Sequence, residues 1–327
     1  MKSVIEWWGR AGYGAFSFNG WHGIFMRIGS WLCLLALCLP AVSGEAGYFE
    51  ELLAKVKHGD AQTLESLVEK ARQGDLLVQS ALGVMYRAGN GVPQDYREAL
   101  YWLRKAAEQN NAAAQAALGA MYARGEGVLQ DYRESVGWLQ KAAGQGHAEA
   151  QSDLGTAYAQ GQGVPHNYEE AFGWYQKAAE QGHAGAQFNL GFLYHQGTGV
   201  VRDYKRAVHW YQQAAEQGNS NAQLNLGLLC AKGYGLAQDP EQAMIWFLKA
   251  AEQKNPQAMF NLGLSHQEGW TVPKDAIKAH MWFNLASANG HREAMPLLEQ
   301  VTRQMSRADV EEAQHQAREW SRQHPER

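Results

Sequence analysis

The sequence predicts an all-α solenoid of paired antiparallel helices, and three observations support this fold class. Residues 114–122 recur 36 residues later as residues 150–158, then as 186–194, and a fourth copy ends at Cys230. Each unit carries two helix-length segments separated by a glycine turn. A unit of this size cannot bury its own apolar face, so neighbouring units must stack. Such stacking produces an extended surface, which favours binding over chemistry.

Composition supports an ordered chain. Of the 327 residues, 46% are hydrophobic and 19% are charged, values that exclude a disordered protein and provide ample material for a core. The formal net charge is −4. A mildly acidic protein is a poor nucleic-acid binder, so we expect no nucleic-acid partner.

Residues 1–44 are predicted to form a secretory signal peptide. An apolar run at 28–39 follows Arg27, small residues at 41–44 offer a cleavage site, and Met26 is an alternative start. The alternative is an uncleaved anchor, the one case in which we expect membrane contact. Leu37 before Cys38 disfavours a lipid anchor. Cleavage removes Cys33 and Cys38, which leaves Cys230 without a disulfide partner, and it moves the formal charge to −6.

The chain contains six repeat units, and each is predicted to pair a first helix, helix A, with a second, helix B. A polar or histidine residue stands at the equivalent first position of every unit. The opening residues are Asp75, Asn111, His147, His183, Asn219 and Asn255. Helix A carries a leucine followed by glycine, at Leu82, Leu118, Leu154, Leu190, Leu226 and Leu262. Helix B carries a tryptophan, at Trp102, Trp138, Trp174, Trp210, Trp246 and Trp282. Glycine in a helix costs about 1 kcal/mol, so we expect a close approach of helix B, with the tryptophan packed against it.

Both helices have sequence signals at their ends. Helix A is expected to end at a left-handed glycine, at Gly89, Gly125, Gly161, Gly197, Gly233 and Gly269. Helix B is expected to begin after an N-cap residue, at Asp95, Asp131, Asn167, Asp203, Asp239 and Asp275. Glu98, Glu134 and Glu170 follow three residues later and predict capping boxes. Pro240 and Pro256 suit the first helical position.

These residues resemble a known repeat family. Residues 186–194, then Gly197 to Val200, Asp203, Ala207, Trp210 and residues 214–218 closely resemble the Sel1-like repeat, a relative of the tetratricopeptide repeat. The resemblance covers residues 75–290 and implies a right-handed superhelix of paired helices. Mild departures, at Asn167, Cys230, His266 and Trp270-Thr271, affect local turns rather than the fold.

The domain organisation follows from the extent of the repeats. Residues 1–44 are the signal peptide, 45–74 an N-terminal helical cap, 75–290 the six repeats, and 291–327 the C-terminal capping helices and tail. Within the N-terminal cap we expect helices at 48–56 and 61–72. In the C-terminal cap we expect a helix at 291–305 and, after the N-cap Ser306, a second helix that runs to about Trp320.

No residue pattern indicates catalysis, a metal centre or a cofactor, so we assign none. The Gly-x-Gly pairs follow helices rather than strands and are predicted to be turns. The aspartate column is predicted to cap helices rather than bind metal. His147, His183 and His291 are predicted to be isolated cap or rim residues rather than ligands, because no carboxylate or thiolate is interleaved at ligand spacing. Cys230 replaces a tyrosine of its column, which favours a buried, inert thiol.

The most distinctive surface lies on helix A of units four to six. Phe188 and Phe192 lie two residues from Leu190, which places them away from helix B on a helical wheel. The expected partner-binding set is an apolar stripe with a neighbouring asparagine column: Phe188, Phe192, His195, Leu224, Leu228, Phe260, Leu264, Asn189, Asn225 and Asn261. The alternative is that the stripe packs between adjacent A helices, and that the asparagines bond a neighbouring loop.

Sequence and resemblance together imply a non-enzymatic scaffold. The expected role is an adaptor of the bacterial envelope, periplasmic or secreted, that binds a peptide or helix on its concave face. One alternative is a cell-wall or β-lactam hydrolase, by family analogy alone, although the chain lacks the paired cysteines of such relatives and a Ser-x-x-Lys motif. The other alternative is a membrane-tethered adaptor that retains its N-terminal segment.

Overall fold

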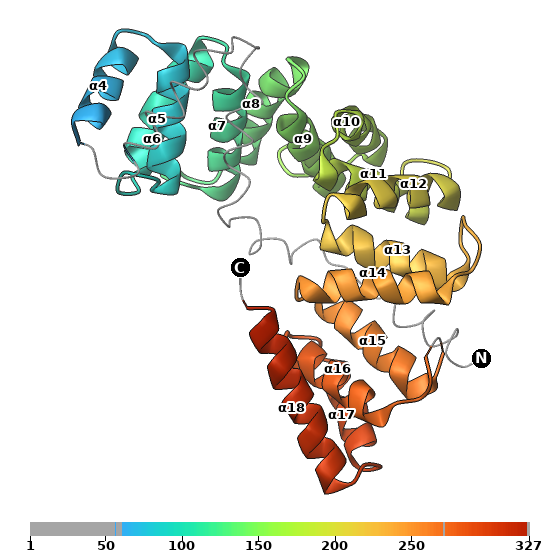
Figure 1. Cartoon of the computed structure of the whole chain (residues 1–327). Coiled ribbons are helices and arrows are strands. Elements are labelled where there is room, and N and C mark those ends of the chain that lie inside the picture. Colours follow the sequence, from blue (N-terminus) through green and yellow to red (C-terminus); the bar gives the residue numbers. More distant parts are fainter. Residues whose placement is uncertain (1–55, 57–60, 271, 326–327) are drawn as a thin grey trace. The chain divides into compact units, whose positions relative to one another are not determined.

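The structure, a computed structural model, describes residue 56 and residues 61–270 and 272–325 (Figure 1). These residues form fifteen α-helices and contain no β-strand. The described chain divides into two compact units, one ending at Trp102 and the other beginning at Leu103, so the boundary lies inside the second helix of the first repeat. The predicted signal peptide, the alternative start at Met26, the expected helix at 48–56 apart from Val56, and Thr271 lie outside the described residues.

The predicted alternation of helices A and B is confirmed over all six repeats. The A helices are α5 (Leu76–Ala88), α7 (Ala112–Arg124), α9 (Ala148–Gln160), α11 (Ala184–Gln196), α13 (Ser220–Lys232) and α15 (Pro256–Glu268). The B helices are α6 (Tyr96–Glu108), α8 (Tyr132–Gly144), α10 (Tyr168–Glu180), α12 (Tyr204–Glu216), α14 (Pro240–Glu252) and α16 (Ala276–Ala288). From α7 onward each A helix packs on its own B helix, and each B helix packs on the next A helix. This sequential packing is that of an α-solenoid.

Local signals set the ends of these helices as predicted. Every A helix stops at a glycine in the left-handed region, such as Gly197 with φ 73°. Every B helix begins after the predicted N-cap, whose side-chain oxygen accepts a backbone N–H, as Asp131 does from Glu134 at 3.1 Å. Pro240 and Pro256 occupy the first helical positions.

The predicted capping boxes at Glu98, Glu134 and Glu170 are wrong. Among the described residues, both bonds of a capping box occur between Ser306 and Asp309 alone. The reason is that the backbone N–H of each B-helix N-cap already donates to helix A of the same repeat: Asp131 to the Tyr122 carbonyl, at 3.0 Å. The backbone N–H of the N-cap is therefore not available to the glutamate side chain. Glu98 instead accepts a hydrogen bond from the indole N–H of Trp102 at 3.1 Å.

The close approach of the two helices at the helical glycine is confirmed, but its partner is not the tryptophan. A Cβ added to Gly191 would lie 2.8 Å from the Tyr211 ring and 3.3 Å from the Ala207 carbonyl. In repeats two to six the residue after the tryptophan fills this position, as Leu139, Tyr175, Tyr211, Phe247 and Phe283. Trp174 is only half-buried, and the Lys177 ammonium lies 4.1 Å from its ring centroid. The tryptophans of the four middle repeats are likewise half-buried beside the face that meets helix A, whereas Trp102 and Trp282 are buried.

A ladder of buried amides, which sequence analysis missed, joins consecutive repeats. Gln187 on α11 donates to the Ala179 carbonyl of the preceding B helix at 3.2 Å and accepts from Gln217, at the end of its own B helix, at 2.7 Å. The same pair of bonds recurs at 36-residue intervals. Its members are Gln115 with Gln145, Gln151 with Gln181, Gln187 with Gln217, and Gln223 with Gln253. Each bridge fixes the position of one repeat on the next.

The Gly-x-Gly turns form a second contact between repeats. Gly199 has φ 68°, and a Cβ there would lie 2.6 Å from the backbone of Tyr168, at the start of the preceding B helix. Glycine is needed both for the left-handed backbone and for this approach. The prediction that these glycines are turns is confirmed.

Three further helices flank the repeats. The first, α4 (Ala61–Arg72), has the predicted bounds. At the other end α17 (Ala294–Thr302) is shorter than the expected helix at 291–305, and it begins without a side-chain cap at Glu293. The last helix, α18 (Arg307–Gln323), begins after Ser306 as predicted and runs three residues past Trp320. Both α17 and α18 pack on α16.

We expect Gly191→Ala to lower the free energy of unfolding by about 1–3 kcal/mol, because its methyl group would overlap the Tyr211 ring. Gly173→Ala is a matched control, since Gly173 is also helical and a Cβ there meets nothing within 4 Å. It should stabilise the protein by about 0.5–1 kcal/mol. Thermal unfolding followed by circular dichroism measures both changes. Equal shifts for the two variants would contradict the tight contact.

Candidate functional site

Helix A of a central repeat is buried on two faces, and this limits what it shows to solvent. On α11, Phe188, Gly191 and His195 all face Tyr211 of α12: the Phe188 ring lies 5.8 Å away and the His195 Nδ1 lies 3.4 Å from the Tyr211 hydroxyl. Tyr194 meets Phe172 of the preceding repeat at 5.4 Å between ring centroids and also accepts a hydrogen bond from Arg206 of α12. The expectation that Phe188 points away from helix B is wrong. The helical-wheel argument assumed that helix A contacts one neighbouring helix. A helix within the stack contacts a neighbour on each side.

The ten residues of the expected stripe therefore divide into two sets. Six are buried and pack inside or between repeats: Phe188, His195, Leu224, Phe260, Asn261 and Leu264. The remaining four are half-buried and lie on the solvent side of α11 and α13: Asn189, Phe192, Asn225 and Leu228. An open apolar trough along all ten positions is not formed. The aromatic contacts of Phe188 and Phe260 are with helix B of their own repeats, at Tyr211 and Phe283, rather than between adjacent A helices.

The four half-buried residues form the A-helix stripe, the name used below for Asn189, Phe192, Asn225 and Leu228. Each helix contributes an asparagine and, three residues on, an apolar side chain, which places the two on one face. The two asparagine side chains form no hydrogen bond with another described residue. In the preceding repeat the same positions hold the polar Asp153 and Thr156. The stripe is thus an amide–apolar pair presented twice at the repeat spacing.

Cationic and aromatic side chains, which sequence analysis missed, gather near one end of the stripe. Tyr204 lies 5.0 Å from Tyr234 and 5.6 Å from His195 between ring centroids. The Arg202 guanidinium lies 5.5 Å from the Tyr204 ring and the Lys232 ammonium 5.9 Å from the Tyr234 ring. Tyr234 departs from its column, which holds Asn90, Glu126, Gln162 and Thr198 in earlier repeats, and that departure was the signal available in the sequence.

Burial controls the protonation of His195. Its pKa is lowered to about 4, first by burial of the ring and then by the nearby charges of Lys232 and Arg202. The imidazole is therefore neutral at neutral pH, and the positive charge of this region comes from Arg202 and Lys232. An acidic group on a partner would be attracted to this end of the stripe.

The other titratable residues singled out in the sequence have structural roles. His147 and His183 are N-caps, and the His183 Nδ1 accepts the Ala186 backbone N–H at 3.1 Å. His291 stacks on Phe260 at 4.2 Å and contacts Gln257 through Nε2 at 2.9 Å. The Cys230 thiol is buried, which raises its pKa to about 11. In the described part of the chain, no three His, Cys, Asp or Glu side chains are grouped to hold a metal ion.

The family follows from comparison with known proteins. The Sel1 repeat model matches six consecutive segments, residues 77–111, 112–147, 148–183, 184–219, 220–255 and 256–291. The chain belongs to the Sel1 repeat family. Sel1 repeat proteins are helical scaffolds for protein–protein interaction and are generally non-catalytic. Their repeat length and helix pairing are those of the six units above.

Two solved Sel1 repeat structures share the fold of this chain. One is c5321, a protective antigen present in uropathogenic Escherichia coli strains, with 33% sequence identity and a TM-score of 0.72; the match covers 89% of this chain and 65% of that protein. This chain therefore spans under two thirds of that relative. The other is a Sel1 repeat protein from Oxalobacter formigenes, with 32% identity and a TM-score of 0.65, covering 76% of this chain and 97% of that one. No curated protein matches the chain.

We expect the N-cap histidines to make stability depend on pH. Burial lowers the pKa of His183 below its ordinary value of 6.5. The neutral ring accepts the Ala186 N–H through Nδ1. The neutral form is thus favoured by folding, so its contribution is full above about pH 6.5 and is lost as pH falls through the folded pKa. His183→Asn keeps the cap, as Asn219 does, and removes this titration.

The melting temperatures of the parent chain and of His183→Asn at pH 7.5 and pH 5 measure the effect. The parent should lose more stability on acidification than the variant. His183→Ala is the control for the cap itself and should cost about 1 kcal/mol at pH 7.5. An equal loss on acidification in the parent and in His183→Asn would contradict the titration.

Proposed function

We propose that this chain is an exported, non-enzymatic scaffold of the bacterial envelope that binds a peptide or helix of a partner protein through the A-helix stripe, on its concave face. The observation that carries the proposal is the repeated pair of an amide and an apolar side chain, Asn189 with Phe192 and Asn225 with Leu228. Both pairs remain partly exposed where the neighbouring columns are buried. Family membership supports protein interaction as the general role.

The chemistry of the stripe selects the class of partner. An asparagine amide donates and accepts at once, so it suits the main chain of a peptide, while Phe192 and Leu228 suit apolar side chains between those contacts. Arg202 and Lys232 near the end of the stripe favour an acidic residue there. The expected ligand is therefore an amphipathic segment with apolar residues followed by an acidic group.

Export is the second part of the proposal. It rests on the predicted signal peptide at residues 1–44. A solved relative, c5321, is a protective antigen present in uropathogenic Escherichia coli strains. No described helix has both the length and the apolar character needed to span a membrane.

Phe192→Asp combined with Leu228→Asp should reduce recovery of the partner by at least tenfold, because two charges replace the apolar contacts of the stripe. Chemical cross-linking in cells, followed by purification and mass spectrometry, measures recovery. Leu129→Asp combined with Val201→Asp is the matched control, because these loop residues are apolar and 92% and 86% exposed yet lie outside the stripe. Unchanged recovery by the folded stripe variant would remove the assignment.

Sequencing of the N-terminus of the protein from its natural location tests export. We expect the mature chain to begin near residues 44–47, directly after the small residues of the predicted cleavage site. An N-terminus that retains residues 28–39 would instead support the tethered adaptor. Fractionation of the same cells gives the compartment, and recovery in the cytoplasmic fraction alone would contradict export.

A further inference from the structure

Helix α18 is held against the repeats by a small apolar contact with one helix, α16. Among the described helices, α16 is the one with which α18 makes extensive contact. The buried residues of α18 are Ala313 and Ala317, and its Trp320 ring meets Trp282 of α16 edge to face at 4.7 Å between ring centroids. Buried alanines contribute little apolar area, so α18 is an element that can open while the repeats stay folded.

The face of α16 under α18 differs from the same face of the earlier B helices. Met281 and Leu285 are buried, whereas at the position of Met281 Tyr101 and Ile245 are 48% and 46% exposed. At the position of Leu285 the earlier B helices hold polar or charged residues: Lys105, Lys141, Lys177, Gln213 and Lys249. Helix α17 takes the place of the next A helix, so the additional burial of α16 comes from α18. Met281, Trp282 and Leu285 form the α16 patch, the name used below for this apolar surface.

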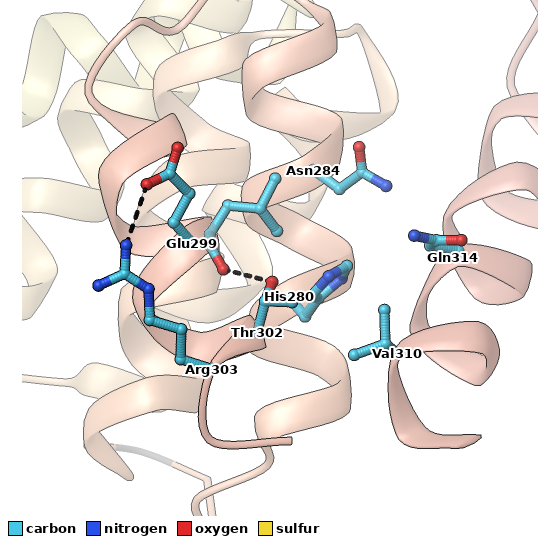
Figure 2. Close-up of a pocket in the computed structure, with 8 residues that line it drawn as sticks. His280, Asn284, Glu299, Thr302, Arg303, Val310 and Gln314 are labelled. Atoms are coloured by element: carbon cyan, nitrogen blue, oxygen red, sulfur yellow. Dashed lines mark hydrogen bonds and ion pairs between the residues drawn. The ribbon is translucent and has the colours of Figure 1, made fainter. Parts of the chain in front are cut away.

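His280 lies beside the α16 patch, where α18 closes over α16. Figure 2 shows its ring between Thr302 of α17 and Val310 of α18. The side chain is 3% exposed, and its Nδ1 is buried without a hydrogen-bond partner. The equivalent residues of the five earlier B helices are all apolar: Leu100, Val136, Phe172, Val208 and Met244. A titratable residue thus replaces an apolar one at this contact.

The surroundings of His280 suit a neutral ring. Val310 and Gln314, which lie near it on α18, carry no charge. Charged groups on the three helices form ion pairs: Glu299 with Arg303 on α17 at 3.7 Å, Lys278 with Asp275 at the start of α16 at 3.8 Å, and Arg307 with Glu311 on α18 at 2.9 Å. His266 of α15 interacts with the pair on α16.

Protonation would place two unfavourable groups at this position. Both nitrogens of an imidazolium are donors, so the His280 Nδ1 would carry a proton that meets no acceptor among the described residues. The ring would also carry a buried positive charge. Burial accordingly lowers the pKa of His280 below its ordinary value of 6.5.

We propose that α18 is an acid-sensitive switch: when His280 takes up a proton, α18 leaves α16 and the α16 patch becomes exposed. The physical cause is the burial of a charge, because an imidazolium is stable in water but not beneath α18. His280 is neutral in the packed state, so its contribution to packing is full above about pH 6.5 and is lost as the pH falls through the pKa of the packed state. The A-helix stripe lies on other repeats, and the switch does not depend on a partner bound there.

Hydrogen exchange of the full chain at pH 7 and pH 5, corrected for the intrinsic exchange rates, measures the opening of α18. One proton and a pKa of 6.5 after release allow the opening constant to rise by at most about 25-fold between these pH values, and we expect a rise of several-fold. At both pH values the amides of α18 should exchange faster than those of α13, since α18 opens while the repeats stay folded. An unchanged constant, or exchange of α18 in step with α13, would overturn the proposal.

His280→Met restores the apolar character of this position and should give the same opening constant at pH 7 and pH 5. His315→Gln and His324→Gln are the matched controls on α18, because His315 lies 3.9 Å from Glu319 and His324 stacks on Trp320 at 4.0 Å. Both controls should keep the rise seen in the parent chain. A rise in His280→Met equal to that of the parent, or loss of the rise in a control, refutes the role of His280.

The histidine resonances of the parent chain provide a check that needs no substitution. With ¹⁵N-labelled histidine, His280 should titrate below its ordinary pKa of 6.5, because the ring is neutral while α18 is packed. Titration of His280 at or above 6.5 with α18 still protected from exchange would show that the ring accepts a proton beneath α18, and the proposal would fail.

Discussion

The buried glutamine of each central A helix is the interaction on which the stacking of the repeats depends. Gln187 lies between two B helices, donating to the carbonyl of one and accepting from the last side chain of the other. A buried amide without partners costs about 1–3 kcal/mol, so a repeat that slipped against its neighbour would lose the bond to the Ala179 carbonyl and leave the Gln187 amide nitrogen buried without it. Apolar packing alone tolerates small shifts, whereas these bonds do not. The ladder therefore sets the register in which the glycine contacts and turns also fit.

The ladder ends where the repeats do. In the sixth unit Met259 and Asn289 replace the two glutamines, and the amide contacts a sulfur at 3.6 Å. Buried side-chain atoms without a hydrogen bond concentrate in the same region. Within the described residues, such an atom is found in Asn261, His266, Gln267, His280, His291 and Trp320, which all lie between 261 and 320. Groups of this kind need an explanation other than packing.

What the sequence predicted correctly is local, and what it missed depends on neighbours. Helix ends follow from a glycine or a cap residue within a few positions, so Gly197 and Asp131 could be assigned without a structure. The role of Phe188 could not, because its burial requires Tyr211 from the same repeat, and the Tyr194 face requires Phe172 from the one before. The glutamine ladder was visible as two columns 30 residues apart. A polar residue that recurs at the same position of every repeat also fits a helix cap, so the recurrence alone does not reveal the ladder.

Burial on two faces also limits how much surface each repeat offers to a partner. Two A helices contribute four half-buried side chains, whereas a stable interface buries about 800 Å² on each partner. A bound segment must therefore continue beyond α11 and α13. Towards α15 the corresponding Asn261 and Leu264 are buried, while towards α9 the corresponding Asp153 and Thr156 are half-buried and polar. If the stripe binds the segment as proposed, its continuation is accordingly expected over α9, where polar residues of the segment would meet Asp153 and Thr156.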